Sequence, residues 1–126
     1  MDRSDIDIFE KLVAQLSSIH QEMSVLAKRA PNDAVNAFKI KLINAAISRS
    51  NELLGERYRP FSDFTSFSAE DLPSNSDVTF IVSQYLECAE KFRSDNIADN
   101  GMGDWYWITK ENPYSLPTAP PKKLEG

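Results

Sequence analysis

The sequence predicts an all-α fold, a small three-helix bundle. Apolar residues recur at helical spacing in three separate segments, and stretches containing proline or glycine divide these segments. Hydrophobic residues make up 41% of the 126 residues, enough for one core. The clearest stripe has apolar residues alternately three and four positions apart: Phe9, Leu12, Leu16, Ile19, Met23 and Leu26. Such a stripe needs other apolar stripes to cover it.

The first two helices are predicted to form an antiparallel hairpin. The first should begin near Ser4, whose hydroxyl can accept a backbone N–H, and end at Ala30 before Pro31. The second should start within residues 31–33 and run to about Leu54, with Gly55 as the left-handed residue after it. Because the link is short, the two helices are expected to be antiparallel neighbours.

The second helix carries two apolar lines, so we expect it to contact two partners and to lie centrally. One line is Val35, Phe38, Leu42, Ala45 and Ala46, and the other is Ile40, Ile43, Ile47 and Leu54.

A third helix is predicted to begin at Ser76 and Asp77 and to end within residues 97–100. The β-branched residues of 78–82 would also suit a strand. However, the three-four spacing continues to the end of the stripe and favours a helix: Val78, Ile81, Val82, Tyr85, Ala89 and Phe92.

An aromatic loop is expected between the second and third helices, where Pro60 and Pro73 exclude one continuous helix. One helical turn fits residues 68–71. Four aromatic residues follow one another at intervals of three: Tyr58, Phe61, Phe64 and Phe67. Either they pack beneath the loop and cover one end of the bundle, or they anchor a partner protein.

The composition changes after residue 100, which divides the chain into a helical bundle, 1–100, and an irregular tail, 101–126. The tail begins with a Gly-Met-Gly joint and ends in a proline-rich stretch expected to run extended. Between them lie Trp105, Tyr106 and Trp107, for which a short strand or an irregular segment is expected. These residues either fold back on the helices or anchor a partner, and one tryptophan could pack inward while its neighbour points out.

No motif for catalysis or for binding a metal or cofactor stands out. His20 is the only histidine and Cys88 the only cysteine, which excludes an internal disulfide and a site needing several of either. Glu87 and Glu90 share one helical face, and we interpret them as solvated surface carboxylates. We therefore expect a protein that is not an enzyme and that has no cofactor, metal site or catalytic residues.

The charge distribution leaves a nucleic-acid alternative open. The formal net charge is -5, which disfavours binding by bulk charge, yet residues 28–59 hold seven basic and three acidic residues. Basic residues near aromatic ones can contact a nucleic-acid backbone and stack bases. The candidates are Lys39, Lys41, Arg49, Arg57 and Arg59.

The leading hypothesis is a non-enzymatic cytoplasmic interaction protein: an adaptor, an accessory subunit or an inhibitor of the immunity type. No apolar run approaches the roughly 18 residues needed to span a bilayer. The expected partner is another protein or a second copy forming a homodimer. The expected partner-binding residues are Tyr58, Phe61, Phe64, Phe67, Trp105, Tyr106 and Trp107.

Overall fold

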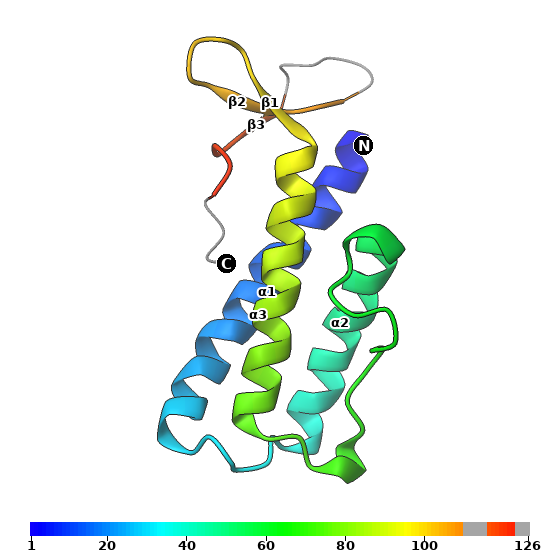
Figure 1. Cartoon of the computed structure of the whole chain (residues 1–126), viewed down its shortest axis with the longest axis vertical. Helices are drawn as coiled ribbons and strands as arrows, with labels where there is room; N and C mark the ends of the chain where they lie inside the picture. Colours follow the sequence, from blue (N-terminus) through cyan, green and yellow to red (C-terminus); the bar gives the residue numbers. More distant parts are fainter. Residues whose placement is uncertain (110–115, 123–126) are drawn as a thin grey trace.

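Three helices and a small antiparallel sheet make up the computed structural model of the chain (Figure 1), which describes residues 1–109 and 116–122. The helices are α1 (Arg3–Arg29), α2 (Ala37–Tyr58) and α3 (Asn75–Asp95), with a 3₁₀ turn, η1, at Ala69–Asp71. The strands are β1 (Ile97–Asp99), β2 (Trp105–Trp107) and β3 (Pro117–Thr118), in the order β1-β2-β3. The three-helix prediction is confirmed, and the sheet is an addition to it.

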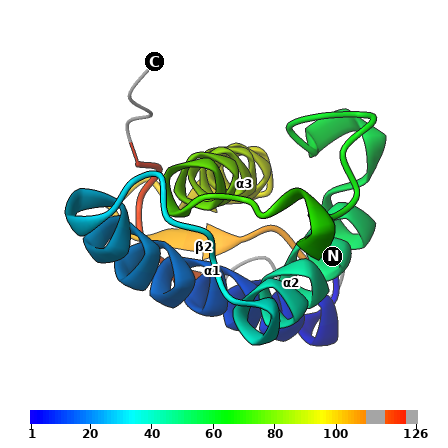
Figure 2. The same cartoon turned by 90° about the horizontal axis from the view of Figure 1, so that it is seen from below.

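The three helices form a triangular bundle with the sheet at one end. α1 runs antiparallel to α2 and α3, which run parallel to each other (Figure 1). In the view from below, α3 lies over the space between α1 and α2 (Figure 2). α2 contacts both other helices, as predicted. The most extensive helix contact joins α1 and α3, however, so the central placement of α2 is wrong. Only one of its apolar lines is fully covered, while Phe38 and Leu42 on the other are exposed.

The predicted stripe of α1 is buried. Phe9, Leu12, Leu16 and Met23 lie in the core, and the two remaining members pack against it. One cluster joins Leu12, Leu16 and Met23 to side chains of α2 and α3, among them Ile47, Val78, Val82 and Tyr85. A second cluster lies nearer the sheet and consists of Ile6, Phe9, Ala89, Ile97 and Trp107.

The residues that cap the helix starts differ from those that the sequence predicted. α1 starts at Arg3, close to the predicted Ser4, but its cap is Asp2: the Asp2 carboxylate accepts the Asp5 N–H at 2.8 Å, and the Asp5 carboxylate accepts the Asp2 N–H at 3.3 Å. α2 starts after Asn36 rather than at residues 31–33, and α3 starts after Ser74 rather than at residues 76–77.

The late start of α2 has a tertiary cause. Residues 31–35 run against 73–76 and exchange backbone hydrogen bonds with them: Val35 donates to Pro73 at 2.9 Å and Asn75 donates to Asp33 at 2.9 Å. The buried side chain of Asn75 adds a bond to the Ala30 carbonyl at 2.9 Å. These bonds hold the α1–α2 link against the α2–α3 link. A helix through residues 31–35 would prevent them, because it would use the same backbone groups for its own hydrogen bonds.

Two helix ends also differ from the predictions. Gly55 has the predicted positive φ, 66°, but the helical segment resumes beyond it and ends at Tyr58. α3 ends at Asp95, earlier than predicted, because Ile97–Asp99 forms β1 and pairs with Trp105–Trp107. The Gly-Met-Gly joint is the hairpin turn, in which Gly101 and Gly103 have positive φ.

Trp107 links the tail to the helices. Its side chain has 0% exposure, its ring meets that of Phe9 edge-on at 5.4 Å between centroids, and its indole N–H donates to Glu10 at 3.0 Å. The described tail residues therefore supply two strands and one of the largest buried side chains of the protein.

Trp107→Ala is expected to lower the free energy of unfolding by about 3–5 kcal/mol, because it opens a large cavity between α1 and α3. Urea denaturation followed by circular dichroism measures the change. Met102→Ala, on the same hairpin but 85% exposed, is the control and should change stability by less than about 0.5 kcal/mol. A loss below about 1 kcal/mol for Trp107→Ala would contradict this placement of the tail.

Candidate functional site

Two surface depressions are the candidate sites of the described residues. The first, here called the aromatic groove, has a volume of ≈ 310 Å³ and is lined by Phe64, Phe67, Asp71, Pro73, Asp77, Phe80 and Ile81. The second, here called the strapped cleft, has a volume of ≈ 540 Å³ and lies between α1, α3 and residues 118–122.

The aromatic loop is held on α2 by two asparagines that the sequence reasoning missed. The Asn44 side-chain amide donates to the Phe67 carbonyl at 2.8 Å and accepts the Phe67 N–H at 2.7 Å, the pairing that a neighbouring strand would provide. Asn51 donates to the Phe64 carbonyl at 3.3 Å and accepts the Tyr85 hydroxyl at 2.6 Å. Both asparagines are therefore anchors for a loop segment that has no strand partner.

The four aromatic residues of the loop do not form one set. Phe64 and Phe67 pack edge-on with ring centroids 5.1 Å apart and line the aromatic groove. Tyr58 instead packs edge-on against Phe92, 5.1 Å away, and donates its hydroxyl to Asp95 at 2.7 Å. That bond to Asp95 and burial both raise the pKa of the Tyr58 hydroxyl. Phe61 is half-buried and is not part of the groove.

Apolar side chains are exposed beside the aromatic groove. Phe80, on the first turns of α3, is 55% exposed and forms part of the lining. Leu72 is 68% exposed and has a φ of 51°, in the left-handed region that side chains with a Cβ rarely adopt. A non-glycine residue in this conformation costs on the order of 1 kcal/mol, and such strain is concentrated at binding sites.

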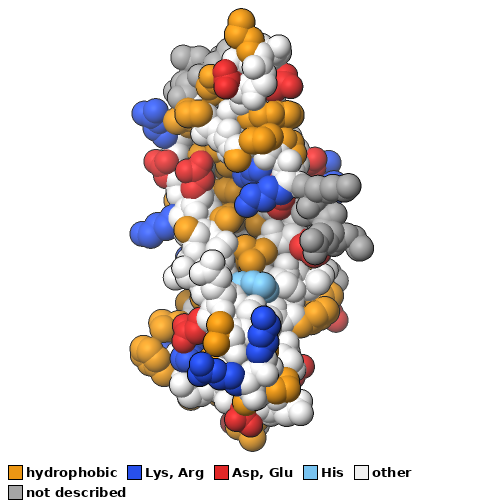
Figure 3. All heavy atoms as spheres, turned by 90° about the vertical axis from the view of Figure 1, so that its left-hand side faces the viewer, with side chains coloured by type: hydrophobic (Ala, Val, Ile, Leu, Met, Phe, Trp, Pro, Cys, Tyr) orange, Lys and Arg blue, Asp and Glu red, His pale blue; other side chains and the backbone are white. Residues whose placement is uncertain are grey.

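The strapped cleft has an apolar floor and a polar edge. Phe9, Val13, Leu86, Ala89 and Trp107 contribute apolar surface, and Glu10, Glu87 and Lys122 contribute charge. On the side of the molecule where α1 and residues 116–122 lie, hydrophobic side chains are visible in a hollow bordered by acidic and basic ones (Figure 3).

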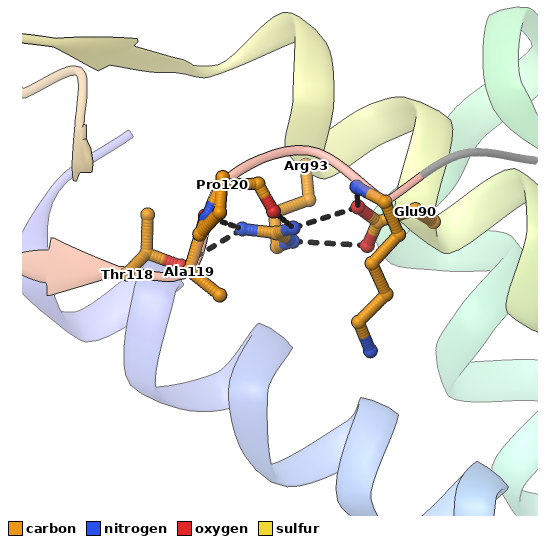
Figure 4. Close-up of polar contacts among 6 residues, drawn as sticks. Glu90, Arg93, Thr118, Ala119 and Pro120 are labelled. Carbon is orange, nitrogen blue, oxygen red and sulfur yellow. Dashed lines mark hydrogen bonds and ion pairs between the residues drawn. The ribbon is translucent and has the colours of Figure 1, made fainter. Parts of the chain in front are cut away.

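A buried ion pair fixes the C-terminal segment beside this cleft (Figure 4). Arg93 donates two bonds to the Glu90 carboxylate, at 2.7 and 2.9 Å. The same guanidinium donates to the Thr118 hydroxyl at 2.9 Å and to the carbonyls of Ala119 and Pro120 at 2.8 and 3.0 Å. Glu90 in turn accepts the Lys122 N–H at 2.9 Å. Glu90, interpreted from the sequence as a solvated carboxylate, is therefore largely buried with a structural role.

The electrostatics of Glu90 reflect this pairing. Burial raises the pKa of its carboxyl, but the hydrogen bond from Arg93, the bond from the Lys122 N–H and the two positive charges lower the pKa more, so the net shift is downward. The carboxylate is therefore stabilised in its charged form in the folded protein.

The remaining predicted tail residues lie on the sheet. Trp105 and Tyr106 are half-buried in β2, whereas Trp107 faces inward. Trp105 packs against the second cluster, on the same face of β2 as Trp107. This fits the alternative in which both tryptophans fold back on the helices, and not the one in which one of them points out.

The basic residues of the nucleic-acid alternative have different neighbours. Lys39 pairs with Glu22 at 2.9 Å, Arg49 donates to Gln15 at 2.6 Å, and Arg59 pairs with Glu56 at 2.9 Å and also bonds the Ser62 carbonyl. The Arg57 guanidinium lies over the Tyr58 ring at 5.2 Å, and Lys41 is exposed. Four of the five side chains therefore already contact a partner within the chain.

Chemical reactivity is not evident at the single cysteine. Cys88 packs against the core, and burial, followed by the negative charge of Glu87, raises the pKa of its thiol. The thiolate, which is the reactive form, is therefore disfavoured. Among residues 1–109 and 116–122, no group of three or more His, Cys, Asp or Glu side chains is arranged to hold a metal ion.

Comparison of the chain with protein-family models, with curated proteins and with solved structures found no match. No helix in the part of the chain that the structure describes has the length and apolar character needed to cross a membrane.

Asn44→Ala is expected to lower the free energy of unfolding by about 1–3 kcal/mol, because the Phe67 N–H and carbonyl lose their partner. Urea denaturation of wild type and variant, followed by circular dichroism, measures this change. Asn32→Ala, at an exposed position before α2, is the control and should be near neutral. Equal stability of the two variants would contradict the anchoring role.

The stability contributed by Glu90 is expected to depend on pH. Its folded pKa is lowered, so the contribution is full above the unfolded pKa of about 4.3 and is lost as pH falls through the folded value. Glu90→Gln should cost about 1–3 kcal/mol at pH 7. Chemical denaturation from pH 7 to pH 3 should show the difference between wild type and Glu90→Gln shrinking with acidification. A difference that stays constant would contradict the assignment.

Proposed function

We propose that this chain is a non-enzymatic protein-interaction module that binds a partner segment in the aromatic groove. The observation that carries the proposal is the grouping of Phe64, Phe67 and Phe80 around one depression, with the exposed and strained Leu72 next to it. Large apolar side chains kept in water beside a formed groove favour association with another protein.

The chemistry of the groove favours a particular kind of partner. Its floor is apolar, and Asp71 and Asp77 lie on its lining. The half of the chain that contains it, residues 61–126, has eleven acidic and five basic residues. We therefore expect a partner segment with an aromatic or aliphatic side chain next to a lysine or arginine.

The loop that forms the groove is pre-organised. Asn44 and Asn51 hold its backbone from α2, and Ile81 supports it from α3. A surface that is ordered before binding loses less conformational entropy on association, which favours a specific complex. Adaptors, accessory subunits and immunity-type inhibitors all act through such surfaces, and the proposal covers this class.

Phe80→Ser is expected to abolish partner capture without unfolding the protein, because the side chain is more than half exposed. Tagged wild-type and variant proteins would be incubated with extract of the native cell, and bound proteins identified by mass spectrometry. Ile8→Ser is a matched control, since Ile8 has the same 55% exposure but lies on α1. Proteins retained by wild type and Ile8→Ser but lost by Phe80→Ser support the proposal, and identical capture by all three contradicts it.

A further inference from the structure

We propose that the strapped cleft is a second binding site, which takes an extended, proline-containing segment of a partner protein in competition with the chain's own residues 116–122. This site is separate from the aromatic groove, and the inference does not depend on the proposed function. The C-terminal segment that borders the cleft shows what chemistry Arg93 and Glu90 recognise.

Arg93 and Glu90 bind mainly backbone atoms of this segment. Arg93 donates to the carbonyls of Ala119 and Pro120, and Glu90 accepts the Lys122 N–H. Proline has no N–H and tends to hold the backbone extended, which leaves its carbonyl free for a donor such as a guanidinium. The Thr118 hydroxyl is the one side-chain group of this segment that Arg93 binds.

The receptor side of the site is built into the bundle. Arg93 and Glu90 lie on the same face of α3 and pair with each other at 2.7 Å. The paired geometry presents the guanidinium toward the segment, as seen in Figure 4. The site therefore does not depend on the segment for its own charge balance.

The chain's own segment fills the site incompletely. Leu116 and Thr118 are held by β2, but Ala119, Pro120, Pro121 and Lys122 are all exposed and bury little surface. A cleft of ≈ 540 Å³ remains beside the segment, lined by the apolar Phe9, Val13 and Trp107. Covalent attachment raises the effective concentration of this segment, so a partner segment must bind more tightly in order to replace it. A partner segment with a bulkier apolar side chain at the Ala119 position would fill the cleft better.

The test uses the full-length chain and a fluorescently labelled heptapeptide with the sequence of Leu116–Lys122. Thr118→Ala combined with Lys122→Pro weakens the attached segment by removing the hydroxyl and the N–H that bind Arg93 and Glu90. Fluorescence anisotropy should show the peptide binding this double variant at least about tenfold more tightly than wild type. Pro121→Ala, at an exposed position of the same segment, is the control and should leave the affinity as in wild type.

Two further measurements decide the proposal. A peptide carrying Ala119→Leu should bind the double variant about tenfold more tightly than the original peptide. Arg93→Lys, introduced with the double variant, should weaken peptide binding at least tenfold because an ammonium cannot form the same fork of bonds. Equal peptide affinity of wild type and double variant, or unchanged affinity with Arg93→Lys, would overturn the proposal.

A measurement on the wild-type chain covers the case in which the double variant does not fold. Saturating unlabelled peptide should shift the backbone N–H resonances of Thr118 and Lys122 of an isotope-labelled chain, because these residues leave Arg93 and Glu90 when the peptide replaces them. A peptide of the same composition in scrambled order should not shift them. Unshifted resonances at millimolar peptide would overturn the proposal.

Discussion

A continuous series of aromatic contacts holds the parts of this molecule together. Tyr58 at the end of α2 packs on Phe92 of α3, Phe92 packs on Phe9 of α1 at 5.2 Å, and Phe9 packs on Trp107 of β2. The series crosses from one core cluster to the other and joins all three helices to the sheet. Because each ring supports the next, the sheet and the C-terminal segment have a defined position relative to the helices.

That arrangement explains why the two candidate surfaces differ. The aromatic groove lies at the end of the bundle where α2 and α3 begin, and its loop backbone depends on amide side chains of α2. The strapped cleft lies nearer the sheet, where the position of Trp107 allows the chain to return along α3. One surface offers apolar side chains, and the other offers a buried ion pair that binds backbone atoms.

Helical periodicity made the three-helix bundle predictable. The pairing of the strands and the start of α2 depend on contacts between segments, which a local sequence pattern does not indicate. The Phe9–Leu26 stripe and the third stripe follow helical spacing over several turns, which is a strong signal. A short strand was one of the two expectations for Trp105–Trp107, but no local pattern indicated its partners, Ile97–Asp99 and Pro117–Thr118, which have only three and two residues. The start of α2 was misplaced for the same reason, since the backbone bonds of residues 31–35 go to residues 73–76.

The site residues show the same division between local and distant information. The aromatic spacing pointed to the loop, but Asn44 and Asn51 look like ordinary polar residues of a helix until the loop lies against them. Likewise, Glu90 and Arg93 are three positions apart, a spacing typical of a weak surface pair. Their importance arises because residues 118–122 cover them, which removes water and strengthens each bond that they make. Sequence alone can place two charged groups on one helical face, but only the tertiary fold converts them into a site that binds a backbone.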